Sequence, residues 1–206
     1  MVDRRKPRPY SRDRAESYRD GILFVIATEG EKTEKQYFDG MFVSRRYQVR
    51  TIGADRRGKS SPKHVLQRID EFKKEYEFEN DDEFWLVIDV DRWKQQQISY
   101  FVKEALKKGC KLAVSNPCFE LFLYLHTKDM SEEESGKEYK AKDMKKMAQS
   151  TGAVNERGDV RIENLKGKEK LAVKRARKMD ENSSHRWPRK TGTHVYKLVD
   201  KLIENI

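Results

Sequence analysis

The chain has 206 residues, of which 39% are charged, and its formal net charge is +10, so it can bury one sizeable core under a strongly solvated, basic surface. A membrane-spanning helix needs roughly 18 consecutive apolar residues, and the chain contains no run close to this length. We therefore do not expect an integral membrane protein. The first 20 residues hold no apolar segment of the kind found in secretory signals, so we expect a cytoplasmic protein with no membrane partner. The two cysteines, Cys110 and Cys118, are interpreted as buried free thiols, with a disulfide as the alternative.

The positive charge is concentrated in two segments. Residues 1–14 hold six Lys or Arg against two acidic residues, and residues 157–190 hold twelve against five. Basic segments on either side of a nearly neutral centre are typical of proteins that bind a polyanion. We therefore expect nucleic acid as the partner; solubilising surface charge is the plainer alternative.

In chain order, residues 1–19 predict a flexible basic arm, because prolines and arginines dominate them. Short apolar or alternating segments then predict strands at residues 22–27, 47–52, 84–88 and 111–114. Segments with apolar residues at one-turn spacing predict helices between them and beyond, at residues 31–43, 62–77, 98–106, 118–126, 131–150, 163–182 and 192–205.

This alternation predicts an α/β fold with a mainly parallel, four- or five-stranded sheet flanked by helices. The alternating residues 47–52 indicate a half-exposed strand near the sheet edge. We predict three parts: the arm 1–19, a catalytic core 20–128, and a basic helical C-terminal extension 129–206 that packs on the core.

Acidic residues follow two of the predicted strands. Asp89 and Asp91 come after the apolar run Phe84–Ile88, and Glu29 comes after the first strand. In an open parallel sheet the ligand site lies beyond the carboxyl ends of the strands, so these carboxylates are expected at one edge. Carboxylate oxygens suit Mg²⁺ or Mn²⁺, and the sequence therefore predicts a metal site with Glu29, Asp89 and Asp91 as ligands.

Glu120 is the only ionisable residue between Cys118 and Leu125, in the first turn of an apolar helix. Because an unpaired buried charge is costly, this carboxylate needs a partner. We predict that Glu120 completes the metal site as a ligand or a general base; a helix cap or an ion pair with an arginine is the alternative. Lys32 is predicted to neutralise charge that develops in the transition state.

Three strings in this chain resemble the RloB family: Thr28-Glu29-Gly30-Glu31-Lys32-Thr33-Glu34-Lys35-Gln36-Tyr37-Phe38, Asp89-Val90-Asp91-Arg92-Trp93 and Ser115-Asn116-Pro117-Cys118-Phe119-Glu120. The Glu-Gly and Asp-x-Asp patterns are also similar to the Toprim catalytic domain of topoisomerases, primases and OLD-family nucleases. The resemblance runs from about residue 20 to the C-terminus. It implies a Toprim-like, Mg²⁺-dependent endonuclease of bacterial antiviral defence, which acts with a separately encoded ATPase partner.

Cleavage of phosphodiester bonds in RNA, such as tRNA, or in DNA is thus the main hypothesis. A non-catalytic nucleic-acid-binding module is the alternative, and the residues decide neither the nucleic acid nor a homo-oligomeric state. The role of Glu34 stays open, since the start of the first helix is less regular than in other Toprim domains. A haloacid-dehalogenase-type phosphatase is disfavoured, because its Asp-x-Asp follows the first strand.

A rival motif lies at Gly53–Ser60, which matches the P-loop pattern and predicts ATP binding as another alternative. The preceding strand is polar, and Pro62 moves the next helix start further along the chain than a phosphate cradle prefers. We instead predict that basic side chains of this loop and of later segments contact nucleic-acid phosphates, namely Arg56, Arg57, Lys59, Arg92, Lys174, Arg175 and Arg177. The segment 187–190 is predicted either to stack on a base or to close the core with Trp187.

Overall fold

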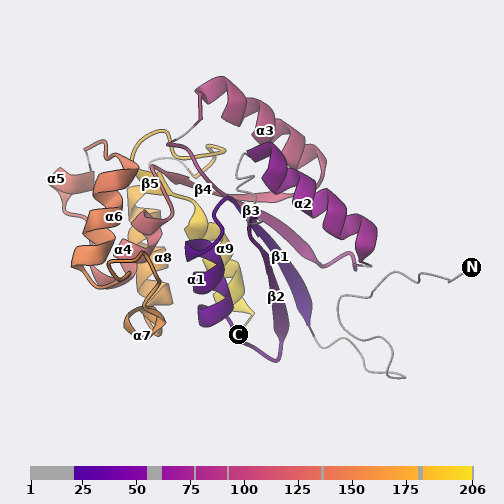
Figure 1. Ribbon diagram of the computed structural model, residues 1–206, viewed down its shortest axis with the longest axis horizontal. Helices are drawn as coiled ribbons and strands as arrows, with labels where there is room; N and C mark the ends of the chain where they lie inside the picture. The colour runs from indigo at the N-terminus through magenta and orange to yellow at the C-terminus, as the bar shows by residue number, and fades with distance from the viewer. Residues whose placement is uncertain are drawn as a thin grey trace, which may run out of the picture.

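The structure is a computed structural model of the chain, shown in Figure 1. It describes residues 21–54, 62–76, 78–91, 93–135, 137–180 and 183–205. The predicted arm, together with the predicted phosphate contacts Arg56, Arg57, Lys59 and Arg92, lies outside these ranges.

One five-stranded sheet, in the order β2-β1-β3-β4-β5, forms the centre of the protein. Its strands are β1 (Ile22–Thr28), β2 (Tyr47–Ile52), β3 (Glu83–Asp89), β4 (Lys111–Asn116) and β5 (Gly192–Thr193). The pairs β2–β1, β1–β3 and β3–β4 are parallel, whereas β5 is antiparallel to β4. The predicted α/β class, the mainly parallel sheet and the edge position of β2 are confirmed.

Helices cover both faces of the sheet. They are α1 (Thr33–Met41), α2 (Pro62–Glu75), α3 (Gln95–Lys107), α4 (Glu120–Thr127), α5 (Glu132–Ser135), α6 (Ala141–Ser150), α7 (Ile162–Leu165), α8 (Glu169–Met179) and α9 (Val195–Glu204). The pair α2 and α3 lies on one face, while α1 and α9 lie on the other (Figure 1). Among the described residues, no helix combines the length and the apolar character that crossing a membrane requires.

The C-terminal segments differ from the predicted elements in three places. Predicted helix 131–150 is split into α5 and α6, and between them Tyr139 N donates a hydrogen bond to Thr191 Oγ1 (3.3 Å). Predicted helix 163–182 is split into α7 and α8 at Gly167, whose φ of +83° suits glycine but not other residues. The start of the predicted helix 192–205 is instead β5, which pairs with β4. At the first and third of these places, segments that are distant in the sequence contact each other.

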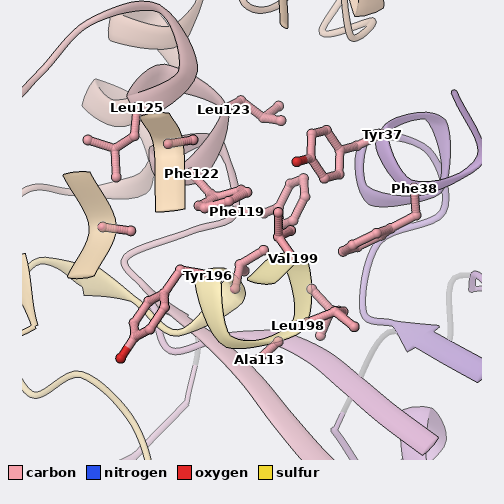
Figure 2. Close-up of a cluster of buried hydrophobic side chains, with 14 of the residues drawn as sticks. Tyr37, Phe38, Ala113, Phe119, Phe122, Leu123, Leu125, Tyr196, Leu198 and Val199 are labelled. Atoms are coloured by element: carbon pink, nitrogen blue, oxygen red, sulfur yellow. The ribbon is translucent and has the colours of Figure 1, made fainter. Parts of the chain in front are cut away.

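The larger core cluster lies between the sheet and helices α1, α4, α8 and α9. In Figure 2, Tyr37 and Phe38 of α1 extend toward Phe119 and Phe122, with Leu198 of α9 beside them. The ring of Tyr37 makes edge-on contacts with Phe119 and Phe122, at centroid distances of 5.5 and 6.0 Å. Residues from both sides of position 128 share this cluster, so the C-terminal part packs directly against the sheet layer. The division at 128 stays a prediction.

Two cysteines and a histidine lie inside the core. Both cysteines, Cys110 and Cys118, are buried and free, which confirms the prediction of free thiols. His126 is also buried; its Nδ1 lies 2.9 Å from the carbonyl oxygen of Phe122, and its Nε2 lies 3.1 Å from the hydroxyl of Tyr37. His126 therefore links α4 to α1 as a neutral ring inside the core.

This environment makes stability depend on pH. Burial lowers the pKa of His126 to about 4. The unfolded chain, with a His pKa of about 6.5, therefore binds a proton before the folded state does, and stability falls as the pH drops from about 6.5 toward 4. Between about pH 7.5 and pH 5, we expect the free energy of unfolding of the wild type to fall by about 2 kcal/mol more than that of His126→Asn. Urea unfolding at both pH values checks this; an equal fall in both proteins contradicts it.

Candidate functional site

Two predicted acids meet where neighbouring parallel strands end. Strands β1 and β3 are paired, with Thr28 opposite Val87, so Glu29 and Asp89 emerge at the same edge. Glu29 N donates a hydrogen bond to the carbonyl oxygen of Val87 (3.0 Å), and Asp89 N donates one to Glu29 Oε2 (3.1 Å). The backbone thus holds the carboxylate of Glu29 against the end of β3.

Two further glutamates reach this edge from helix starts. Glu120 is the first residue of α4 and is 9% exposed, and Glu34 lies in the first turn of α1 and is 6% exposed. Glu34 Oε1 accepts a hydrogen bond from Gly30 N (3.0 Å). A Cβ atom at position 30 would lie 2.3 Å from Glu34 Oε2, so the glycine after Glu29 makes room for this carboxylate.

These acids line one pocket with a volume of about 300 Å³. Its lining consists of Glu29, Gly30, Glu31, Lys32, Thr33, Glu34, Ala54, Asp89, Phe119, Glu120 and Lys145. Four of the five predicted catalytic residues are therefore brought together, namely Glu29, Asp89, Glu120 and Lys32. The fifth, Asp91, is exposed and outside the lining, and its backbone N–H donates to the carbonyl oxygen of Pro117 (3.4 Å).

The carboxylates of the pocket repel one another and raise one another's pKa values. Burial raises the pKa of Asp89 well above its usual range, and the negative charges of Glu34, Glu120, Glu29 and Asp91 raise it further. Burial and then the charge of Glu120 raise the pKa of Glu34, while Lys145 and hydrogen bonds from the backbone oppose this shift. A positive charge placed among these groups would relieve the repulsion.

The lining fits a divalent cation in its donor chemistry. All the candidate donors are carboxylate oxygens, which hard cations prefer. Asp89 Oδ1 is buried and has no hydrogen-bond partner among the described residues, so it is the oxygen with most to gain from a cation. As the side chains stand, however, the described residues contain no group of three or more His, Cys, Asp or Glu that could hold a metal ion. The carboxylates would have to turn toward one another to bind one.

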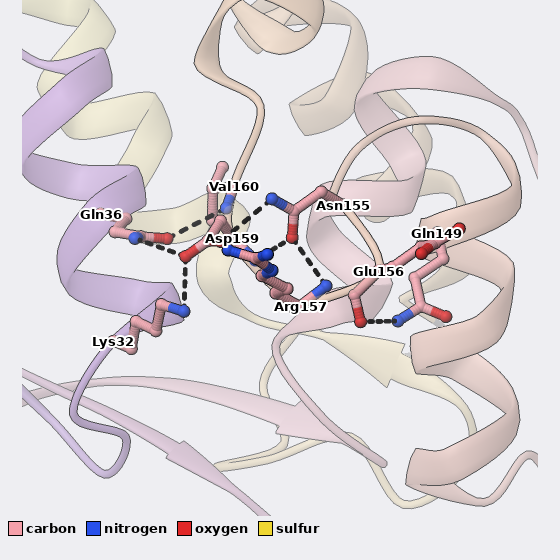
Figure 3. A network of polar contacts seen from close by, with 8 residues as sticks. All are labelled: Lys32, Gln36, Gln149, Asn155, Glu156, Arg157, Asp159 and Val160. Carbon is pink, nitrogen blue, oxygen red and sulfur yellow. Dashed lines mark hydrogen bonds and ion pairs between the residues drawn. The ribbon is translucent and has the colours of Figure 1, made fainter.

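Lys32 lines the pocket but is held in an ion pair. Its Nζ lies 2.5 Å from Asp159 Oδ1, in the network of Figure 3. The carboxylate of Asp159 also accepts hydrogen bonds from Gln36 (3.2 Å) and Asn155 (3.0 Å). These donors hold the pKa of Asp159 far below its usual range. The network ties the loop before α7 to the first turns of α1, and the predicted catalytic role of Lys32 stays a prediction.

Lys145 is a pocket residue that the sequence did not single out. It lies on α6, and its Nζ is 3.7 Å from Glu120 Oε1, so Glu120 forms an ion pair with a lysine from a distant segment rather than with an arginine. No local signal distinguishes Lys145 from the other lysines of this charged segment. Glu34, whose role the sequence left open, is the other addition to the site.

The P-loop-like segment begins beside the same pocket. Gly53 follows the edge strand β2, and Ala54 lines the pocket and donates its backbone N–H to the carbonyl oxygen of Gly30 (3.3 Å). Residues 55–61 lie outside the described part of the chain. ATP binding by this segment therefore stays an alternative.

The predicted phosphate contacts on α8 lie outside the pocket lining, and two of them have structural partners. Lys174 is exposed, whereas Arg177 pairs with Asp200 (2.5 Å). Arg175 Nη1 donates to the carbonyl oxygen of Leu125 (2.6 Å) and, more weakly, to that of His126 (3.3 Å). Arg175 thus caps the end of α4, and binding of nucleic acid by α8 stays a prediction.

The hydrogen bonds from Arg175 to the end of α4 are expected to stabilise the protein. Replacing Arg175 with alanine leaves carbonyl groups at the end of α4 without their charged donor, so we expect the free energy of unfolding to fall by about 1–3 kcal/mol. Lys174→Ala, an exposed position on the same helix, is the matched control and should change it by less than about 0.5 kcal/mol. Urea unfolding of both variants checks this; equal stabilities would contradict a capping role.

Comparison with known proteins gives one match. The family model described as RloB-like protein matches residues 24–202. No curated protein and no solved structure matches the chain.

Proposed function

Because the chain belongs to the RloB-like family, we propose that it is a nuclease that uses Mg²⁺ or Mn²⁺ to cleave phosphodiester bonds in nucleic acid. The observation that carries the proposal is the pocket in which Glu29, Glu34, Asp89 and Glu120 come together, with Asp89 Oδ1 buried and without a hydrogen-bond partner among the described residues. Such a group of oxygens at the carboxyl ends of parallel strands suits a divalent cation beside a phosphate.

In this proposal the residues of the pocket divide the work. When bound, a divalent cation supplies positive charge to the phosphate and lowers the pKa of a water molecule. Asp89 and Glu29 bind the cation, and Glu120 is a further ligand or the general base. Lys145, beside Glu120, and Lys32, which also lines the pocket, would place positive charge beside a bound phosphate.

Three parts of the proposal come from the resemblances of the sequence to RloB proteins and Toprim domains. These are the Toprim-like character of the core, the role in bacterial antiviral defence, and the separately encoded ATPase partner. The basic composition of the chain supports a polyanionic substrate but does not distinguish RNA from DNA.

A substrate panel with a separate metal-binding measurement tests the proposal. The full chain is incubated with labelled tRNA, another RNA, single-stranded DNA and duplex DNA, each with Mg²⁺, Mn²⁺ or a chelator. We expect at least one substrate to be cleaved with Mg²⁺ or Mn²⁺, and we expect the chelator to abolish this cleavage. Binding of Mn²⁺ is measured in parallel by electron paramagnetic resonance, with wild type and Asp89→Asn. Salt-sensitive binding of nucleic acid without cleavage in either metal, and without Mn²⁺ binding, would instead support a non-catalytic binding module.

ATP binding through Gly53–Ser60 is the second candidate, since these residues match the P-loop pattern in full. Calorimetry with ATP and Mg²⁺ on wild type and Lys59→Ala decides it. We expect no nucleotide binding by either protein and a modest loss of nucleic-acid affinity in the variant. Clear ATP binding by the wild type that Lys59→Ala removes would favour the ATP-binding interpretation.

A further inference from the structure

A second hollow lies beside helix α3 and shares no lining residue with the acid pocket. It has a volume of about 530 Å³ and is lined by Gln95, Gln96, Ser99, Tyr100, Lys103, Trp187 and Arg189. Its lining combines two aromatic rings with two cations and contains no acidic residue. This composition differs from that of the acid pocket and suits an anionic ligand with flat rings.

The hollow lies toward the same edge of the sheet as the acid pocket. Helix α3 begins at Gln95, shortly after β3 ends at Asp89. Asn116 Nδ2, at the carboxyl end of β4, donates a hydrogen bond to the carbonyl oxygen of Pro188 (3.2 Å) and so holds the neighbouring Trp187 and Arg189 near that end. A ligand that occupies this hollow is therefore close to the strand ends from which Asp89 emerges.

The two aromatic rings are accessible to different degrees. Tyr100 is 69% exposed although α3 packs against the sheet. Tyr100 also lines a further hollow of about 590 Å³ between α2 and α3, so its side chain borders open space on two sides. Trp187 is partly buried against the core cluster under α2 and α3, and it lines the basic hollow as well.

The charges distinguish the two hollows that Tyr100 borders. In the hollow between α2 and α3, Asp70 pairs with Lys108 (2.6 Å), so the positive charge of Lys108 is neutralised by a neighbouring carboxylate. In the basic hollow, the exposed residues Lys103 and Arg189 leave an excess of positive charge next to the rings. Cations beside exposed rings complement phosphates beside bases.

We propose that the hollow formed by α3 and residues 187–189 binds single-stranded nucleic acid and leads it to the acid pocket. A base stacks on the exposed ring of Tyr100, beside Trp187, and Lys103 and Arg189 contact the adjoining phosphates. In a duplex the bases are paired and stacked inside, so this surface favours single strands. Delivery of a substrate to the acid pocket rests on the proposed function, whereas binding of single strands to this hollow does not depend on cleavage.

Binding is tested in the full chain carrying Asp89→Asn, so that no substrate is cleaved. Fluorescence anisotropy in a chelating buffer measures affinity for labelled single-stranded RNA, single-stranded DNA and duplex DNA. Adding Tyr100→Ala should weaken binding of single strands about 5- to 100-fold and change duplex binding much less, because stacking on one ring is lost. Tyr100 is exposed, so this change should not disturb folding.

Phe78→Ala is the matched control. Phe78 is another exposed aromatic residue, 45% accessible, with Lys73 beside its ring, but it precedes the amino end of β3. Its removal should leave binding of single strands unchanged. Lys103→Ala and Arg189→Ala should each lower the salt dependence of single-strand binding, by a slope of about 0.7.

The outcomes separate this inference from the nuclease proposal. If Tyr100→Ala binds single strands as tightly as Phe78→Ala does, or if no single strand binds at all, the stacking surface is wrong, whether or not the wild type cleaves. If Tyr100→Ala loses affinity while the wild type cleaves no substrate, the surface stands and the nuclease proposal fails.

Discussion

Replacing Asp89 with asparagine is expected to lower metal-dependent cleavage by at least about 100-fold. In metal sites, loss of a residue that only orients a ligand costs about 10–100-fold in metal affinity or activity, and Asp89 is proposed to bind the cation directly. Asparagine keeps the shape of the side chain but removes its charge. The variant should remain folded, since it also removes one of the mutually repelling carboxylates of the pocket. Initial rates at saturating Mg²⁺ or Mn²⁺ measure the effect.

Asp70→Asn is the matched control for this change. Asp70 lies on α2, where it pairs with Lys108 outside the acid pocket, so its replacement should leave cleavage close to that of the wild type. Asp91→Asn adds a second comparison, because Asp91 was predicted as a ligand but is exposed outside the lining. If both Asp89→Asn and Asp91→Asn retain full metal-dependent activity, the assignment of the metal site is wrong.

Leu198→Ala should lower the free energy of unfolding by about 2–5 kcal/mol, through the lost apolar contact and the cavity that remains. Leu198 lies on α9 and is fully buried in the larger core cluster, beside residues of α1 and α4. If the C-terminal segment shares one cooperative unit with the sheet, urea unfolding of the variant should still show a single transition, shifted to lower urea.

Leu171→Ala is the matched control for Leu198→Ala, because both variants replace a leucine with alanine. Leu171 lies on α8 of the same C-terminal segment but is 41% exposed, so its replacement should cost less than about 1 kcal/mol. Circular dichroism and tryptophan fluorescence follow the two variants in parallel. Two separate transitions in Leu198→Ala, only one of them shifted, would show that the C-terminal segment unfolds on its own.

Much of the candidate site could be predicted because it depends on local patterns. The apolar runs of β1 and β3 determine two buried parallel strands, and parallel strands end at the same edge of a sheet. That rule is enough to bring Glu29 and Asp89 together. Glu120 was recognisable for a similar reason, since it is an isolated charge in the first turn of an apolar helix. Fold class and family membership follow from the same segments.

Only the tertiary structure decided which other side chains join these acids. Glu34 and Lys145 line the pocket because α1 packs beside β2 and α6 packs beside α4, and no periodicity along the chain records such contacts. Asp91 leaves it because the chain turns after β3, where Val90 N donates to the carbonyl oxygen of Ser115 (2.9 Å). Likewise, residues 192 and 193 form a strand because β4 offers them backbone partners. Side-chain patterns determine elements and their buried faces, whereas contacts between distant segments depend on how those faces pack.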